Sequence, residues 1–265
     1  MNNNIAYLKI ENISKNFSTP NGCLPVLEKI NLEVKQSDFV CIVGPSGCGK
    51  TTLLNIIANL ESATAGRVLY KGKTLLTTEP NRLVIFQELG LFPWLNVRDN
   101  VEFGLKVKKI PSAKRKKIAE EYLRMVNLIK FKNFFIHELS GGMKQRVALA
   151  RALAMDPEIL LMDEPFAALD AQTRDLLHQE LQKIWSDTKK TILFVTHNVR
   201  EAVCLGDKVI VFSAQPASIK ASFEINLPRP RQIESPGLID TVRPIIEELK
   251  PEIAKITKVN HEENN

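Results

Sequence analysis

The stretch "IVGPSGCGKTTLL", residues 42–54, decides the fold class of this chain. It matches the pattern G-x-x-x-x-G-K-[ST], whose significance depends on what surrounds it. Before it, "DFVCIVG" is a short apolar run typical of a buried strand, and after it "TTLLNIIANLES" has helical apolar spacing from Leu53 to Leu60. Strand, glycine loop and helix in this order predict an α/β fold with a phosphate-binding loop.

The glycine loop suits a triphosphate for three physical reasons. Glycine permits positive φ, so successive N–H groups form a concavity for an anion, and the following helix adds partial positive charge at its N-terminus. Lys50 would reach the β- and γ-phosphates, and Thr51 would hold Mg²⁺. The alternative is a glycine-rich turn with a surface lysine, which both flanks disfavour. The predicted nucleotide contacts in the loop are Gly44, Pro45, Ser46, Gly47, Cys48, Gly49, Lys50, Thr51 and Thr52.

Composition allows one large domain, or one domain with an inserted subdomain. The chain has 265 residues, of which 44% are hydrophobic and 25% are charged, and its formal net charge is +6. This basic excess fits nucleic acid, an anionic membrane surface or an acidic partner, and equally a solvated basic face. The dense run "KVKKIPSAKRKK", residues 106–117, carries similar alternatives: an exposed helix end and loop, or attraction to anionic lipid headgroups or nucleic acid.

Cysteine spacing argues against a disulfide framework or a zinc site. Cys23, Cys41, Cys48 and Cys204 form no C-x-x-C pair, and no histidine stands near them in a ligand pattern. A reducing cytoplasm is therefore expected. The N-terminal "MNNNIAYLKI" shows no signal-peptide pattern, and no apolar run approaches the roughly 18 residues of a membrane span. We expect a chain that spans no membrane but can dock on a membrane protein.

Two adjacent carboxylates end a second apolar run. In "EILLMDEPFAALD", residues 158–170, the predicted strand is followed by Asp163 and Glu164. Side chains alternate along a strand, so the two carboxylates point differently. Asp163 suits Mg²⁺ at the phosphate loop, and Glu164 suits a general base for an attacking water. An acidic turn ended by Pro165 is the alternative.

A histidine follows a third apolar strand in "TILFVTHN", residues 191–198. His197 stands at a strand's carboxyl end, where open α/β sheets bind ligands, so it could contact the γ-phosphate and help fix the water. An exposed or structural histidine is an equally good interpretation.

A glutamine and an apolar patch follow in "VIFQELGLFPW", residues 84–94. The amide of Gln87 can sense Mg²⁺ or water at the end of its run. The next residues are either simple core or a docking surface for a partner helix. They are Leu89, Leu91, Phe92, Pro93 and Trp94.

A second anion site is predicted in "ELSGGMKQRVALARAL", residues 138–153. Ser140 can cap the helix that begins near Gly142. A serine hydroxyl, two glycines and a helix N-terminus favour a bound anion, so one chain carries two phosphate-binding helix starts.

Together these motifs resemble the ATP-binding subunit of ABC transporters. "GPSGCGKTT", Gln87, "LSGGMKQR", "LLMDEP", "ALD" and "THN" stand in the family's order over roughly 35–215, and "LSGGMKQR" is highly specific. "FQELGLFPWLNVRDNV" and "LFVTHNVREAV" look like the nitrate/sulfonate/taurine importer branch. The resemblance implies an ATPase with ATP and Mg²⁺ as cofactors, the metal being held by Thr51, Gln87 and Asp163, with Glu164, His197 and Lys50 as catalytic residues.

The resemblance also implies a head-to-tail dimer in which each copy completes the other's site. The residues expected to act on the partner copy's ATP are Ser140, Gly141, Gly142 and Gln145. Asp170 would lie near the dimer seam. Phe17 matches the aromatic residue that stacks on adenine, although an apolar residue in an N-terminal strand or hairpin explains it nearly as well.

The expected architecture is a P-loop NTPase with a mostly parallel core sheet, an N-terminal antiparallel β subdomain and an inserted α-helical subdomain. The ATPase domain would span 5–250, with the helical insert at 88–155 carrying the signature motif. A tail at 225–265 would be partly helical or disordered.

The expected function is to energise uptake of a small anionic nutrient through membrane permease subunits, fed indirectly by an extracytoplasmic substrate-binding protein. The chain would lie peripherally at the cytoplasmic face of the membrane, without nucleic acid. Alternatives are an ABC-type ATPase in export or lipoprotein release, a nucleic-acid ATPase of the repair type, or a P-loop kinase; the last leaves "LSGGMKQR" unexplained.

Three positions depart from the family's pattern. Asn198 stands where an aspartate usually follows the histidine, so a charge is lost but hydrogen bonding is kept. Ser37-Asp38 replaces a usual glycine before the strand. "SAQPASIK" at 213–220 lacks the usual Pro-Gly turn, which leaves the C-terminal strands open.

Overall fold

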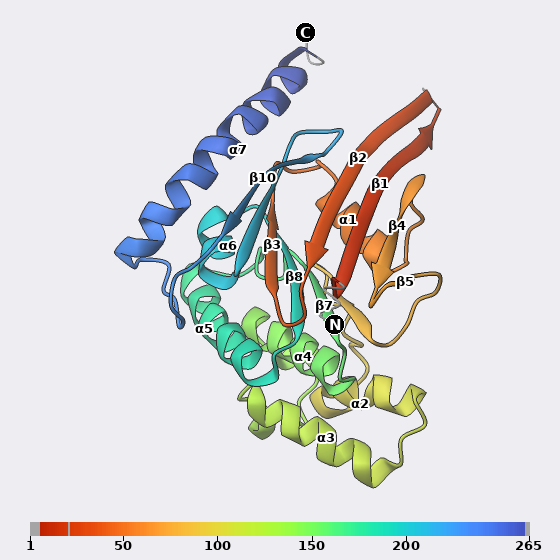
Figure 1. Cartoon of the computed structure of the whole chain (residues 1–265). Helices are drawn as coiled ribbons and strands as arrows, with labels where there is room; N and C mark the ends of the chain where they lie inside the picture. The colour runs from red at the N-terminus through yellow and green to blue at the C-terminus, as the bar shows by residue number, and fades with distance from the viewer. Residues whose placement is uncertain (1–5, 21, 263–265) are drawn as a thin grey trace, which may run out of the picture. The chain divides into compact units, whose positions relative to one another are not determined.

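The computed structural model describes residues 6–20 and 22–262 (Figure 1). The chain divides into two compact units, one formed by Met1–Glu79 with Lys190–Asn265 and the other by Pro80–Lys189. The outermost residues of the predicted domain and tail, residue 5 and residues 263–265, lie outside the described ranges. Within those ranges, no helix combines the length and the apolar character needed to cross a membrane.

The first unit contains an antiparallel sheet of order β2-β1-β4-β5. Strands β1 and β2 form a long hairpin whose register runs from Leu8 opposite Val34 to Thr19 opposite Gly22. This is the predicted N-terminal antiparallel sheet. Its strands are β1 (Leu8–Thr19), β2 (Gly22–Val34), β4 (Ala65–Tyr70) and β5 (Lys73–Thr74).

The same unit contributes β10, β9, β3 and β8, adjacent in that order, to a mostly parallel sheet. Strand β3 is parallel to both β8 and β9, and β10 is antiparallel to β9. Every residue of β3 and β8 is buried, as expected for parallel strands covered on both faces. The predicted P-loop fold class is confirmed. These strands are β3 (Phe39–Val43), β8 (Thr191–Thr196), β9 (Lys208–Phe212) and β10 (Ile219–Glu224), with 213–218 connecting the last two.

The helix after the glycine loop, α1 (Lys50–Ile57), is shorter than predicted. Leu53, Ile56 and Ile57 are buried as expected, but Leu60 is 54% exposed, so its predicted place on the buried face is wrong. Asn59 has φ 58°, a left-handed conformation that asparagine tolerates better than most residues and that ends the helix before Leu60.

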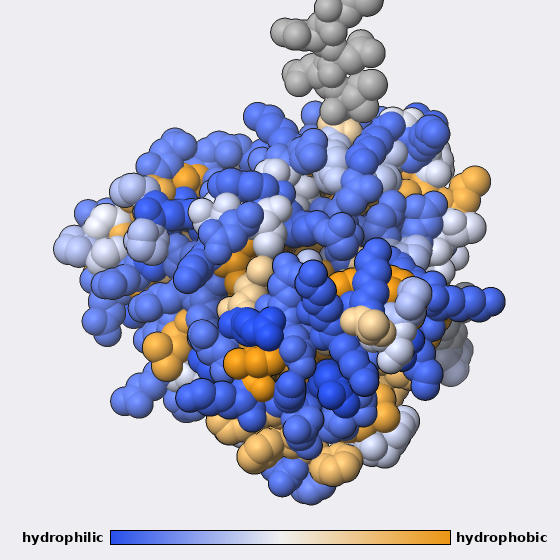
Figure 2. Space-filling model, turned by 90° about the horizontal axis from the view of Figure 1, so that it is seen from below, coloured by the Kyte–Doolittle hydropathy of each residue, from blue (hydrophilic) through white to orange (hydrophobic). Residues whose placement is uncertain are grey.

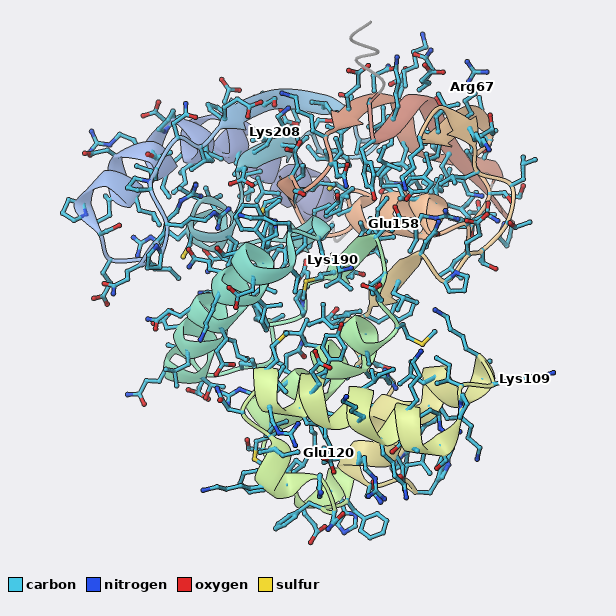
Figure 3. All side chains as sticks on the ribbon, turned by 60° about the horizontal axis from the view of Figure 1, so that its bottom comes forward. Arg67, Lys109, Glu120, Glu158, Lys190 and Lys208 are labelled. Atoms are coloured by element: carbon cyan, nitrogen blue, oxygen red, sulfur yellow. The ribbon has the colours of Figure 1, made fainter. Side chains whose placement is uncertain are left out.

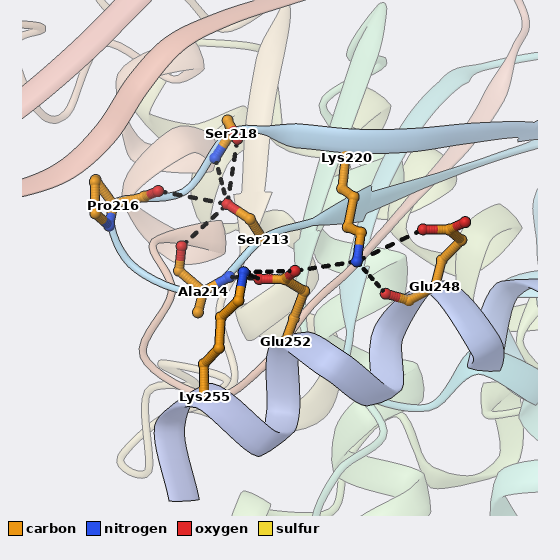
Figure 4. Close-up of polar contacts among 8 residues, drawn as sticks. All are labelled: Ser213, Ala214, Pro216, Ser218, Lys220, Glu248, Glu252 and Lys255. Atoms are coloured by element: carbon orange, nitrogen blue, oxygen red, sulfur yellow. Dashed lines mark hydrogen bonds and ion pairs between the residues drawn. The ribbon is translucent and has the colours of Figure 1, made fainter. Parts of the chain in front are cut away.

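Helix α7 (Pro236–Glu262) lies along the first unit, beside α6 (Val199–Leu205). Its buried residues repeat at helical spacing and are Leu238, Val242, Ile245, Leu249 and Glu252. A carboxylate thus ends an apolar stripe. Figure 4 shows how it is satisfied: Glu252 accepts from the Ala214 N–H at 3.0 Å and from Lys220 Nζ and Lys255 Nζ at 3.0 and 2.9 Å.

Replacing Glu252 by glutamine is expected to lower stability by roughly 1–3 kcal/mol at neutral pH, because a buried charge-assisted network loses its acceptor. Burial alone would raise the pKa of Glu252, but the Ala214 N–H, Lys255 and Lys220 lower it to about 2. The contribution is therefore full above the unfolded pKa of about 4.3 and is lost as pH falls toward 2. Thermal unfolding from pH 7 to pH 2 measures it, with exposed Glu247→Gln as control; parallel curves for Glu252→Gln and the parent would contradict this assignment.

The second unit pairs β6 (Arg82–Ile85) with β7 (Ile159–Asp163) in parallel, and Ile85 lies opposite Met162. Helices α2, α3 and α4 pack on one another, and Ala119, Leu123 and Val126 are fully buried. The predicted 88–155 insert lies within this unit. The helices of the second unit are α2 (Val97–Val107), α3 (Ser112–Met125), η1 (Ile129–Phe131), η2 (Ile136–Glu138), α4 (Gly141–Ala154) and α5 (Ala171–Thr188), of which α5 follows the predicted insert.

The basic run 106–117 spans the end of α2 and the start of α3, and its lysines are exposed. Lys109, in the turn between the two helices, projects outward (Figure 3). The surface seen from below is mainly hydrophilic, with scattered hydrophobic patches (Figure 2). The most exposed large apolar side chains of the second unit are Phe86, Trp94, Phe103, Val107, Phe134, Phe135 and Leu176.

Candidate functional site

The glycine loop follows β3 and encloses the side chain of Lys50. This lysine is only 5% exposed, and its Nζ donates to the carbonyl oxygens of Gly44 and Pro45, both at 2.9 Å. Gly49 has φ 112° and is the N-cap of α1, so the first N–H groups of that helix face the loop without a side-chain cap. A buried ammonium and helix N–H groups without a side-chain cap are features that suit an anion, and the phosphate contacts of the loop stay a prediction.

Replacing Gly49 by alanine is expected to damage the loop more than replacing Gly47. At Gly49 a Cβ would lie 2.8 Å from Val26 Cγ1 and 2.9 Å from Leu27 Cδ2, besides the strain of positive φ. At Gly47, with φ 76°, a Cβ would meet nothing within 4 Å, so only backbone strain remains. We expect Gly49→Ala to lower the melting temperature and to weaken ATP binding about tenfold or more. Equal effects of the two variants in calorimetry would contradict this steric argument.

His197 stands at the same sheet edge as the glycine loop. Val43, which precedes the loop, lies opposite Thr196 in the parallel register of β3 and β8, and His197 follows as an exposed residue. Asn198 caps α6 by accepting from the N–H groups of Arg200 and Glu201 at 3.0 and 3.3 Å. Asparagine is as good an N-cap as aspartate, which explains why this departure from the family's pattern keeps the local structure.

Phe17 lies in β1, half-buried and opposite Leu24 of β2. Lys15 Nζ stands 4.6 Å from the centre of the Phe17 ring. Two contacts hold that ammonium, to Glu61 Oε1 at 2.7 Å and to the Ser62 carbonyl at 2.8 Å. Phe17 therefore belongs to the β1–β2 hairpin, as one of the two sequence interpretations had it, and adenine stacking stays a prediction.

In the second unit, Gln87 follows β6, and Asp163 and Glu164 stand at the end of β7, its parallel neighbour. Strand β6 ends at Ile85 opposite Met162, so Gln87, Asp163 and Glu164 come from the same edge. Asp163 is 7% exposed and ends β7, whereas Gln87 is exposed. Glu164 has φ 42°, a left-handed conformation that non-glycine residues adopt rarely, and proline follows it. Nine other non-glycine residues of the described ranges also have positive φ, so this conformation alone does not mark a functional site, and the general-base role of Glu164 stays a prediction.

The signature motif begins α4. Ser140 is its N-cap and accepts from the Met143 N–H at 3.3 Å, which confirms the predicted helix start. Ser140 and Gly141 are exposed, but Gly142 is buried, and a Cβ there would lie 2.5 Å from Thr173 Cγ2. Gln145 is 3% exposed, and its side-chain nitrogen has no hydrogen-bond partner among the described residues.

The Asp170 segment lies next to this helix start. A Cβ on Gly141 would approach Leu169 Cδ2 at 3.3 Å, so α4 and the segment before α5 are close neighbours. Asp170 is the N-cap of α5 and accepts from the Thr173 N–H at 2.9 Å. That hydrogen bond lowers the pKa of Asp170 and keeps its carboxylate ionised. Asp170 thus has a structural role beside its predicted place at a dimer seam.

The apolar residues after Gln87 are not simple core. Leu89, Leu91 and Phe92 are half-buried, whereas Trp94 is 71% exposed. A groove of about 400 Å³ lies beside Trp94. It is lined by Trp94, Leu95, Asp99, Glu102, Phe103, Lys106 and Arg115.

Sequence reasoning missed two polar residues that organise this segment, Asn100 and Arg151. Asn100 is fully buried and exchanges hydrogen bonds with the backbone of Phe92. Arg151 donates to the carbonyls of Leu89 and Gly90. The available signal was a lone arginine within the apolar run "VALARALA" of the signature helix.

Comparisons with known proteins agree with these motifs. A family description for ABC transporters matches residues 27–167. An uncharacterized ABC transporter ATP-binding protein of Methanocaldococcus jannaschii is 50% identical over 251 residues, covering 95% of this chain and 94% of that protein. A nitrate import ATP-binding protein of Synechocystis sp. is 45% identical, covering 84% of each chain. A bicarbonate transport ATP-binding protein of Synechococcus elongatus is 42% identical, covering 86% of this chain and 83% of that protein.

Solved structures point the same way. The dimeric structure of a bacterial ABC transporter cassette superposes with a TM-score of 0.74 at 33% identity, covering 83% of this chain and 100% of the cassette. A dimeric post-hydrolysis state of the same ATP-binding cassette, bound to ADP and Pi, gives a TM-score of 0.73 with the same identity and coverage. The chain belongs to the ABC transporter family, as an ATP-binding and ATP-hydrolysing subunit that resembles those of the nitrate importer branch.

Proposed function

We propose that this subunit energises the import of a small oxyanion such as nitrate through a membrane permease. The observation that carries the proposal is the identity of 45% and 42% to ATP-binding proteins named for nitrate import and bicarbonate transport, over more than four fifths of each chain. Nitrate and bicarbonate are both small, planar, singly charged oxyanions. The permease would hold the subunit at the cytoplasmic face of the membrane.

The proposed active form is a head-to-tail dimer. Each chain carries two helix starts suited to an anion, the loop before α1 and the Ser140 start of α4. Ser140 and Gly141 are exposed, and a second copy could therefore reach them. A solved relative with this fold is itself a dimer. ATP between two copies would favour the closed dimer, and hydrolysis would release it.

Residues of this chain fit Mg²⁺ by the chemistry of their donors. The hydroxyl of Thr51, the amide oxygen of Gln87 and the carboxylate of Asp163 are hard oxygen ligands, which Mg²⁺ prefers. When bound, the ion would neutralise phosphate charge. Lys50 would hold the β- and γ-phosphates, Glu164 would take a proton from the attacking water, and His197 would position the γ-phosphate.

The cargo is tested by uptake in a strain that lacks this gene. Complementation with the parent chain should restore growth on nitrate as the sole nitrogen source, and complementation with Glu164→Gln should not. Growth restored only with a sulfonate as the sole sulfur source would instead favour a sulfonate importer. No change in uptake of any nutrient would favour an export role.

Replacing Trp94 by alanine is expected to impair transport while sparing ATP hydrolysis by the isolated subunit. The side chain is 71% exposed beside the groove, so its loss removes a docking contact and little core packing. We expect at least about a tenfold loss of permease-stimulated activity, since exposed tryptophans are frequent anchors. Trp185→Ala on α5 is the matched control. Equal loss of both activities in Trp94→Ala would show that Trp94 stabilises the fold instead.

A further inference from the structure

One side chain of the signature helix holds the segment that follows Gln87. Arg151, on α4, donates from Nη1 to the Gly90 carbonyl at 2.7 Å and from Nη2 to the Leu89 carbonyl at 2.6 Å. Its guanidinium also lies 5.7 Å from the centre of the Phe92 ring. Burial lowers the pKa of Arg151. A planar fork with two acceptors and an aromatic face is an arrangement that arginine makes and lysine cannot.

The segment held in this way has no regular secondary structure of its own. It lies between the end of β6 at Ile85 and the start of α2 at Val97. Its backbone groups therefore need partners from elsewhere. Asn100 of α2 satisfies the Phe92 N–H at 2.9 Å and the Phe92 carbonyl at 3.1 Å, and Arg151 of α4 satisfies the carbonyls of Leu89 and Gly90. Two helices thus fix the conformation of the apolar patch.

The helix that carries Arg151 also carries the signature serine. Ser140 caps α4, and Arg151 lies eleven positions further along the chain, which is roughly 16 Å at the helical rise. The C-terminal end of α4, where Arg151 lies, packs tightly against α2. A Cβ on Gly104 of α2 would lie 2.3 Å from Sδ of Met155, the residue that follows α4. Rigid secondary elements are among the physical carriers of coupling between two sites.

We propose that Arg151 is a positioning residue that locks the 89–92 segment to α4, so that the apolar patch and the Ser140 helix start move as one body. The inference rests on the proposed function, because the patch is assigned there to the permease. A permease that displaces the patch would then displace Ser140. The proposed link is mechanical, because Arg151 acts through its contacts with Leu89, Gly90 and Phe92.

The fluorescence of Trp94 gives a measurement that would not change if Arg151 only stabilised the fold. The chain has 2 tryptophans, so Trp185→Phe leaves Trp94 as the sole emitter. In that background we compare Arg151→Gln and Arg151→Lys with the parent and with Arg146→Gln. Arg146 is the matched control, since it lies on the same helix and pairs with Glu180 of α5 at 2.9 Å. Acrylamide quenching of Trp94 reports the order of the segment.

We expect the Arg151 variants to change Trp94 quenching and permease stimulation but not the basal ATPase activity. Arg151→Gln should raise Trp94 quenching by up to about 1.4-fold, which is the limit for a side chain that is already 71% exposed. It should reduce permease stimulation of ATPase about tenfold, a typical size for coupling between sites, while isolated-subunit ATPase stays within about twofold. Arg151→Lys keeps the charge and the aliphatic stem, so this variant should fold and show an intermediate loss of permease stimulation. Arg146→Gln should leave Trp94 quenching at the parent value.

Two results would overturn the inference. Unchanged Trp94 quenching in both Arg151 variants would show that the segment is held without the guanidinium. Equal loss of basal and permease-stimulated ATPase would show that Arg151 only contributes to core packing. If the parent chain responds to no permease, the proposed function fails, but the quenching comparison still decides whether Arg151 holds the segment.

Discussion

Glu164→Gln is expected to cut ATP hydrolysis by about 10²–10⁴-fold, the usual contribution of a general base, while ATP binding survives. The amide keeps the shape of the side chain but cannot accept a proton from water at neutral pH. The left-handed backbone at Glu164, φ 42°, holds the carboxylate just beyond β7 and should tolerate this isosteric change. Because ATP would then persist, a nucleotide-bound dimer should accumulate. Steady-state phosphate release and size-exclusion chromatography with ATP measure the two effects.

Glu158→Gln is the control for this prediction. It removes a carboxylate at the opposite end of the same strand, one residue before β7 begins. Its hydrolysis rate should stay near that of the parent. Normal turnover by Glu164→Gln would remove the general-base role, and a variant that binds ATP yet stays monomeric would contradict the head-to-tail dimer.

Lys50→Ala is expected to weaken ATP binding about ten- to hundredfold, since charge-assisted hydrogen bonds contribute roughly 1.5–3 kcal/mol. The ammonium is buried and already lies inside the loop, 2.9 Å from the carbonyls of Gly44 and Pro45. Phosphate oxygens would replace these acceptors with little movement of the side chain. Equilibrium binding of ATP measures the loss, and hydrolysis should fall with it.

Lys73→Ala, on the exposed strand β5, removes the same charge away from the loop and serves as control. Thermal unfolding of both variants separates lost binding from lost folding. Unchanged affinity of Lys50→Ala for ATP would exclude Lys50 from the phosphate cradle.

The glycine loop and its flanks were predictable because the information is local. An apolar run before the loop, left-handed glycines within it and helical spacing after it specify strand, turn and helix without distant partners. The same holds for Ser140, whose cap acts within three residues, to Met143. The nucleotide roles of these residues remain predictions, and Glu164→Gln and Lys50→Ala test two of them.

Other features depend on contacts that a sequence pattern does not contain. Leu60 falls on the helical repeat, yet α1 stops before it. Trp94 sits in an apolar run, yet it is 71% exposed, and the backbone near it is held by Arg151 and Asn100. Arg151 acts across 61 and 62 positions of sequence, a separation over which periodicity carries no signal.

By itself, then, the sequence determined the phosphate loop, the order of strands and helices around it, and the family, because each follows from short-range pattern and backbone preference. Only the tertiary structure decided which apolar residues face outward, how the segment after Gln87 is held, and that a buried carboxylate, Glu252, anchors α7. Those outcomes come from packing and hydrogen bonding between segments that are distant in sequence. Which groups are buried and which hydrogen bonds they form therefore depends on the whole fold.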